Sequence, residues 1–281
     1  MARKRATLTD LLNELTYKTL FDRYKLIAVN MWEWENLPEG ILPRHIENLL
    51  FSDGMACFFR DPKMSYMCLK AGNGPGLNVY GDPLTYRATG FNYNKVYDAE
   101  DCVIIENNLL RIPTQPFITH YVNKLSEAER TMDVNVKACK TPVVFTCDNN
   151  DVLTWKTIFQ KVDGNAPVIF ADRGLNMDSI QAFLTGVQFL GNDLMDYKAS
   201  VESDLLTFLG QNNTPVDKKE RLITSEADAN NQIIQSFVDL QQEARERACD
   251  AINEKWGLNI KVSRRSEPVE NSVGGVENVP A

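Results

Sequence analysis

The feature that most constrains the fold is a pair of long amphipathic segments between positions 189 and 256, separated by a polar, basic stretch. In the first segment, apolar residues recur every three or four positions, which predicts one buried helical face: Leu190, Leu194, Tyr197, Val201, Leu205 and Phe208. The opposite face is interpreted as acidic, with Asp193, Asp196, Glu202 and Asp204. Gly210 predicts the end of this helix, because glycine tolerates the left-handed conformation that closes one.

The stretch that follows is too polar and too interrupted to pack into a core, so a loop is expected over 211–229. A second helix is predicted over 230–262, and its apolar positions are Ile233, Ile234, Phe237, Leu240, Ala244, Ala248, Ile252 and Trp256. A helix of about 20 residues is roughly 30 Å long. Two such helices joined by a basic loop are a poor arrangement for an enzyme active site. They are a good rigid support for a charged loop.

Charge limits the partners of this chain. The formal net charge is −8, which excludes a generic nucleic-acid binder. Any contact with nucleic acid has to come from one of two local clusters: Arg3, Lys4 and Arg5, or Lys218, Lys219 and Arg221. For each cluster the alternative is an ordinary solvated surface patch.

Metal sites, cofactors and membrane spans are not expected. The six cysteines include no Cys-x-x-Cys pair and only two histidines are present, so a zinc site is not predicted. No apolar run is long enough to cross a bilayer, and the basic start lacks the apolar core of a signal peptide. The cysteines are therefore interpreted as reduced thiols of a cytoplasmic protein.

Together these patterns predict an α+β fold that is mainly α, built from three long helices, a small β-rich, barrel-like region and a compact α/β insert. Two tryptophans, Trp32 and Trp34, lie near the end of the first helix. Either they insert that helix end into the surface of a partner, or they pack at a corner of this chain's own hydrophobic core. The expected segments are a basic tail 1–6, a helix 7–40, the β-rich region 41–112, a helix 113–140, the insert 141–186, a helix 187–210 and a mobile tail 263–281.

Enzymatic chemistry is not expected. The sequence has no Gly-x-Ser-x-Gly elbow, no His-Glu-x-x-His and no nucleotide loop ending in Gly-Lys-Ser/Thr. The long helices have broad apolar faces that a single chain of this size cannot easily cover, so oligomerisation is expected.

Several segments, in the same order, resemble the upper collar proteins, also called head–tail connector or portal proteins, of phi-twenty-nine-like podophages. They are the Met-Ala-Arg-Lys-Arg start and residues 32–38, 140–143, 164–171, 207–210, 218–221 and 252–259. The ordered set spans nearly the whole chain.

The resemblance implies a ring of twelve subunits at one vertex of the phage head, in the virion, with a channel for double-stranded DNA. It makes the three long helices a stem, 41–112 a wing, 141–186 a clip and 230–262 a crown. The loop would hang into the channel, with Lys218, Lys219 and Arg221 facing DNA. Implied partners are the capsid, scaffolding and lower collar or tail proteins and a separate packaging ATPase.

The sequence also departs from the family pattern. Stem lysines of the family align near Leu184 and Asp193 here, so several rings of lysines are not expected. The cluster Arg3, Lys4 and Arg5 matches a segment that contacts a packaging RNA, and a contact with the motor or the capsid is the alternative. Two other interpretations stay open: an oligomeric cytoplasmic helical scaffold or adaptor with no DNA role, and an enzyme with an unrecognised carboxylate site.

Overall fold

The computed structural model describes residues 8–140, 143–146, 181–184, 188–211 and 224–265. The chain divides into two compact units, one formed by residues 1–127 and 198–281 and the other by residues 128–197. Both ends of the basic loop predicted from sequence fall in the first unit. No helix within the described ranges combines the length and the apolar character that a membrane span requires.

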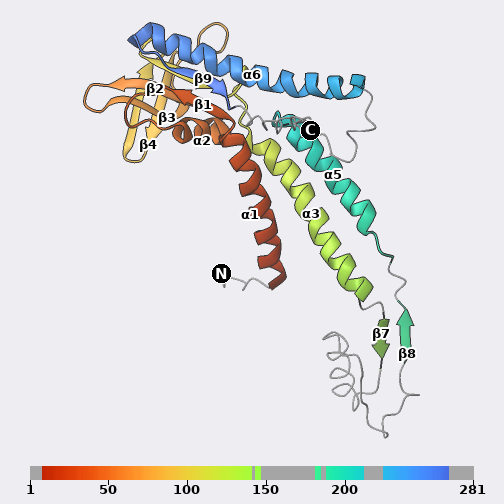
Figure 1. The fold of residues 1–281 in the computed structure, drawn as a ribbon. Coiled ribbons are helices and arrows are strands. Elements are labelled where there is room, and N and C mark those ends of the chain that lie inside the picture. Colours follow the sequence, from red (N-terminus) through yellow and green to blue (C-terminus); the bar gives the residue numbers. More distant parts are fainter. Residues whose placement is uncertain (1–7, 141–142, 147–180, 185–187, 212–223, 266–281) are drawn as a thin grey trace, which may run out of the picture. The chain divides into compact units, whose positions relative to one another are not determined.

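The helices of the first unit are shown in Figure 1. Their bounds are α1, Leu8–Val29; α2, Pro43–Asp53; α6, Thr224–Trp256; and the parts of α3, Gln115–Lys140, and α5, Gly191–Phe208, that lie in this unit. The long helices predicted from apolar periodicity are therefore present. Helix α6 begins earlier than predicted and ends at Trp256 rather than at 262, because Gly257 turns the chain with φ +65°.

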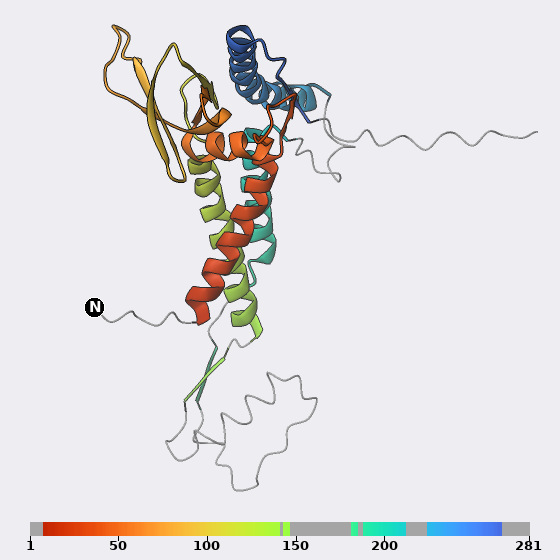
Figure 2. The ribbon, with the colours of Figure 1, turned by 90° about the vertical axis from the view of Figure 1, so that its left-hand side faces the viewer.

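In the first unit, α1 and the parts of α3 and α5 that lie there share one apolar core, which is called the stem core below. Leu20 and Tyr24 of α1 pack with Ile118 and Val122 of α3 and with Leu205 of α5. On each helix these side chains are three or four residues apart, so they align along one face. In Figure 2, α1 stands in front of the other two helices.

The β-rich region is a five-stranded antiparallel sheet of order β5-β4-β3-β2-β6. Its strands are β2, Met55–Asp61; β3, Ser65–Asn73; β4, Thr85–Gly90; β5, Tyr93–Asp98; and β6, Cys102–Glu106. Strand β4 begins only at Thr85. The preceding residues form a loop in which the Asn78 side-chain oxygen accepts hydrogen bonds from the Tyr80 and Asp82 amides, both at 2.9 Å.

The sheet curls, so that β5 crosses the face of β2. The ring of Phe59 lies 4.4 Å from that of Tyr97 and 5.7 Å from that of Tyr93, between centroids. Asp61, at the end of β2, accepts hydrogen bonds from Tyr93 and Lys95 of β5. The enclosed cluster includes Cys57 and Cys102. The curled sheet is nevertheless open rather than a closed barrel, because its edge strands β5 and β6 are not paired with each other.

The two tryptophans form a core corner, and they lie in a strand rather than at a helix end. Strand β1, Trp32–Glu35, pairs antiparallel with β9, Lys261–Arg264. Trp32 and Trp34 are both buried, whereas Glu33 and Glu35, which alternate with them, are exposed. The expectation of a mobile tail from 263 is therefore wrong at Ser263 and Arg264, which the pairing with β1 holds in place.

The second unit contains the remaining parts of α3 and α5 and an antiparallel pair of strands, β7, Val143–Thr146, and β8, Gln181–Leu184. The Asn135 side chain joins α3 to the start of α5. It donates to the Gln188 carbonyl at 2.8 Å and accepts from the Leu190 amide at 3.0 Å. The rest of the predicted insert lies outside the described residues.

Candidate functional site

All six cations singled out in the sequence fall outside the described residues: Arg3, Lys4, Arg5, Lys218, Lys219 and Arg221. The structure does, however, describe the two elements between which Lys218, Lys219 and Arg221 lie. Helix α5 ends at Phe208, and α6 begins at Thr224. The candidate site is therefore built from the end of α5, from α6 and from their supports.

The end of α5 is closed at Gly210. The Gly210 amide donates to the Thr207 carbonyl at 3.0 Å, and the Gln211 amide donates to the Leu206 carbonyl at 2.8 Å, which together form a Schellman motif. Gly210 has φ +72°, and a Cβ at this position would lie 2.3 Å from Cγ2 of Val238 on α6. Only glycine therefore fits, because it meets both the conformational and the packing demand.

Gly210, at the end of α5, is also held by a contact from β9. The Arg264 guanidinium, on β9, donates a hydrogen bond to the Gly210 carbonyl. Strand β9 follows α6 through a tight turn in which Asn253 exchanges two hydrogen bonds of 2.8 Å with the backbone of Ile260. The described chain that precedes the basic stretch therefore ends at a point tied to both α6 and β9.

The acidic face of α5 differs in one member from the sequence interpretation. Asp193, Asp196 and Asp204 are exposed. Glu202 instead faces α1, where it accepts a hydrogen bond from Tyr24 Oη at 2.8 Å and lies 3.2 Å from the Arg23 guanidinium. At 3.6 residues per turn, position 202 falls about opposite positions 193 and 204. Inclusion of Glu202 in the acidic face was therefore wrong.

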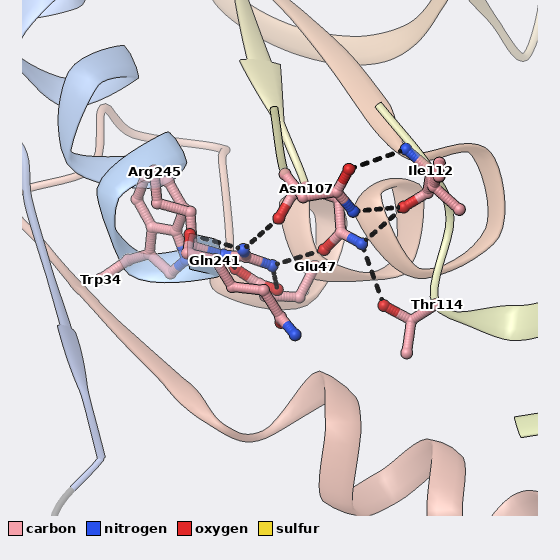
Figure 3. Close-up of polar contacts among 8 residues, drawn as sticks. Trp34, Glu47, Asn107, Ile112, Thr114, Gln241 and Arg245 are labelled. Atoms are coloured by element: carbon pink, nitrogen blue, oxygen red, sulfur yellow. Dashed lines mark hydrogen bonds and ion pairs between the residues drawn. The ribbon is translucent and has the colours of Figure 1, made fainter. Parts of the chain in front are cut away.

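A buried ion pair fastens α6 to the rest of the first unit (Figure 3). Arg245 Nε lies 3.0 Å from Oε1 of Glu47, on α2, and Nη2 lies 2.8 Å from Oε2. Trp34 Nε1 donates to the same carboxylate at 2.9 Å, and the Arg245 guanidinium stacks over the ring of Trp32. No motif in the sequence marked this cluster, because Glu47 and Arg245 are far apart along the chain.

Asn107 extends the same cluster toward the start of α3. Its side-chain oxygen accepts from Arg245 Nη2 at 3.1 Å, and its amide donates to the Ile112 carbonyl at 2.9 Å and to Thr114 Oγ1 at 3.0 Å. The connection between β6 and α3 is thus held against α6 by side-chain hydrogen bonds.

Beside this cluster lies an apolar groove of about 370 Å³. The ring of Phe208 lies 4.7 Å from that of Phe117 and 5.8 Å from that of Phe237, between centroids. Leu109, Leu110, Ile112 and Leu240 complete its apolar lining. Exposed apolar side chains around a hollow are typical of a contact surface rather than of a polar reaction centre.

Among the described residues, no group of three or more His, Cys, Asp or Glu is arranged to hold a metal ion. Among the carboxylates that the structure describes, Asp61 is the most strongly perturbed: its pKa is held well below its usual range by the hydrogen bonds from Lys95, the Lys63 backbone amide and Tyr93. That carboxylate closes the curled sheet and is satisfied by its neighbours, so its role is structural.

Comparison with known proteins gives consistent matches along the chain. The family described as Phage Connector (GP10) matches residues 4–269. A chain from the portal and tail of native bacteriophage P68 is similar, with TM-score 0.50 and 15% identity over 96% of this chain and 94% of that chain.

Two further solved structures are similar to this chain to a comparable degree. A chain from the neck of an empty GTA particle computed with C6 symmetry has TM-score 0.50 and 12% identity over 95% of this chain and 86% of that chain. An HK97 family phage portal protein from Corynebacterium diphtheriae has TM-score 0.48 and 12% identity over 94% of this chain and 96% of that chain.

Proposed function

Because the chain belongs to the phage connector family, we propose that it is a portal protein. Copies of the chain assemble into a ring at one vertex of the phage head. Double-stranded DNA is packaged through the central channel, retained there and later ejected, and the ring joins the head to the tail. The protein is accordingly a component of the virion that is made in the host cytoplasm.

The observation that carries this proposal is the fixed exit of α5. The stretch with Lys218, Lys219 and Arg221 follows Gly210 in the sequence, and α6 and β9 hold Gly210 in place. A cationic segment on a rigid support can be repeated around a ring with each copy in the same position. Such a ring of positive charge binds phosphates by counterion release, without reading the base sequence.

The exposed carboxylates of α5 complement this role. Asp193, Asp196 and Asp204 give α5 a negative surface. When several copies of that surface line a channel, they repel the phosphates of the duplex and keep it from adhering to the wall. We infer that DNA slides past α5 and is held loosely at the basic stretch.

The finer assignment is to the phi-twenty-nine-like podophages, with twelve subunits in the ring. The partners we infer are the major capsid and scaffolding proteins and a lower collar or tail protein. The basic start with Arg3, Lys4 and Arg5 contacts a packaging RNA, the motor or the capsid. The chain is not an enzyme, and a separate ATPase drives packaging.

The test uses purified rings and measures binding of double-stranded DNA over a series of salt concentrations. The double variant Lys218→Ala/Lys219→Ala keeps its ring in negative-stain images but binds DNA less tightly, with a smaller slope of log K against log salt concentration. The matched control is Lys63→Ala/Arg87→Ala, which removes two exposed cations of the wing and leaves the slope unchanged.

Two results would count against the proposal. A monomeric, dimeric or solid particle in place of a ring removes the channel and returns the chain to the class of helical scaffolds. Intact rings whose DNA affinity and packaged DNA are the same with and without Lys218 and Lys219 remove the role of the basic stretch.

A further inference from the structure

Helix α1 carries apolar side chains on two opposite faces. Leu20 and Tyr24 face the stem core. Leu11, Leu15 and Leu26 are 52%, 60% and 64% exposed. At 3.6 residues per turn these three leucines fall on one side, opposite to Leu20 and Tyr24. A helix that is apolar on both faces is one that is covered on both faces.

No described element covers this outer leucine face. Figure 2 looks onto α1 with the other stem helices behind it. The charged neighbours on that side, among them Lys18 and Asp22, are also exposed. Three large apolar side chains are thus presented to solvent along more than three turns of helix.

The first unit has a second apolar surface, which is the groove beneath α6. Leu110 and Leu240 on its rim are 74% and 53% exposed. The groove is lined by the loop before α3 and by α3, α5 and α6, without any residue of α1. The two apolar surfaces therefore belong to different sides of one folded body, held in place by the buried pair of Arg245 and Glu47.

We propose that the outer leucine face of α1 in one subunit packs against the groove side, beneath α6, of the next subunit. This inference rests on the proposed ring and names the surfaces that build it. Two different surfaces in contact make a head-to-tail interface, which leaves one free copy of each surface at the ends and can close only as a ring. A single self-complementary surface would stop at a dimer.

The occupant of the groove is thus a second copy of this chain. Both surfaces expose large apolar side chains, and the loss of apolar area from water is the main driving force of permanent interfaces. Leu26 lies near the end of α1 that packs, through Tyr24, at the level of Ile118 and Leu205. The groove begins at the same level with Phe117 and Phe208, so neighbours set side by side bring Leu26 to the groove.

The experiment blocks each surface separately. One variant carries Leu15→Glu and Leu26→Glu, and the other carries Leu110→Glu and Leu240→Glu. Each is expected to be a folded monomer by mass measurement and far-ultraviolet circular dichroism. Mixed in equal amounts they form a heterodimer and nothing larger, because each contributes its one intact surface. The control Val79→Glu/Phe91→Glu alters wing residues that are 93% and 97% exposed and keeps the wild-type mass.

Cross-linking gives a second, independent result in case a variant fails to fold. A chain with both Leu26→Cys and Leu240→Cys, treated with a bismaleimide, gives a ladder of covalent multimers, whereas each single variant gives no more than wild type. Variants that keep the wild-type mass, a mixture that stays monomeric, or the absence of a ladder would overturn the assignment of surfaces. A wild-type chain that is itself monomeric would instead overturn the proposed ring.

Discussion

Arg245 and Glu47 form a two-pronged ion pair in which both side chains are only 2% exposed. The pair joins α6 to α2, and it is completed by Trp34, Asn107 and the Gln241 carbonyl. Every charged atom of the pair has a partner, as a buried charge requires.

Removal of one partner of this pair is expected to be costly. Arg245→Ala should lower the free energy of unfolding by about 3–5 kcal/mol, because it leaves the Glu47 carboxylate buried without its counter-charge. Urea unfolding followed by tryptophan fluorescence, at one fixed protomer concentration, measures this change. The control is Lys70→Ala, which removes the exposed pair with Asp53 and should cost at most about 1 kcal/mol. Equal losses for the two variants would mean that the buried pair does not hold α6.

Gly210 is expected to accept no side chain. Gly210→Ala combines a strained positive φ with a contact between the new Cβ and Val238. The control Gly40→Ala introduces only the strain, because Gly40 has φ +89° and a Cβ added there would meet no atom within 4 Å. Thermal melts should show a larger fall in melting temperature for Gly210→Ala than for Gly40→Ala. The additional change Val238→Ala should recover part of that difference, and no recovery would contradict the packing argument.

The lowered pKa of Asp61 predicts that this carboxylate contributes to the loss of folding stability in acid. Its folded pKa is lowered by the hydrogen bond from Lys95, the Lys63 amide and Tyr93. A carboxylate with a lowered folded pKa stabilises the fold above its unfolded pKa of about 3.9, and this stabilisation is lost as the pH falls through the folded pKa. Asp61→Asn should therefore flatten the pH dependence of unfolding below about pH 4. An acid limb as steep as that of wild type would show that other carboxylates dominate.

The cysteines should differ widely in reactivity. Burial raises the pKa of Cys68 and of Cys249 to about 12, so neither forms much thiolate at neutral pH. Cys139 is only partly buried. With a disulfide reagent at pH 8, Cys139 should react before Cys68 and Cys249, which should react only on unfolding. A variant Cys139→Ser identifies the fast step, and fast modification of Cys68 in the folded chain would contradict its place in the core.

The long helices were predictable because their core contacts repeat along one segment. The residues Val201 and Leu205 have the helical spacing that the structure confirms. The direction of a particular side chain was harder to predict, as Glu202 shows. Its position on α5 is acidic in pattern, yet it faces Tyr24 because the helix turns it toward α1.

Strand β1 was missed even though it carried a local signal. The alternation of Trp and Glu over 32–35 matches the alternating burial of a strand. Its only partner in the described chain, β9, lies near the end of the sequence, so no segment next to β1 in the sequence indicated the pairing. The ion pair of Arg245 and Glu47 was unpredictable for the same reason. The contacts proposed between the basic residues and DNA stay predictions.

The pairing of β1 with β9 has a consequence for how the protein is made. Trp32 and Trp34 leave the ribosome early, whereas their partners Val262 and Arg264 leave it late. The core that unites β1, α6 and β9 can close only after translation has passed Arg264. A nascent or prematurely terminated chain therefore lacks the core that unites β1, α6 and β9, and we expect it to lack the support that this core gives to the groove.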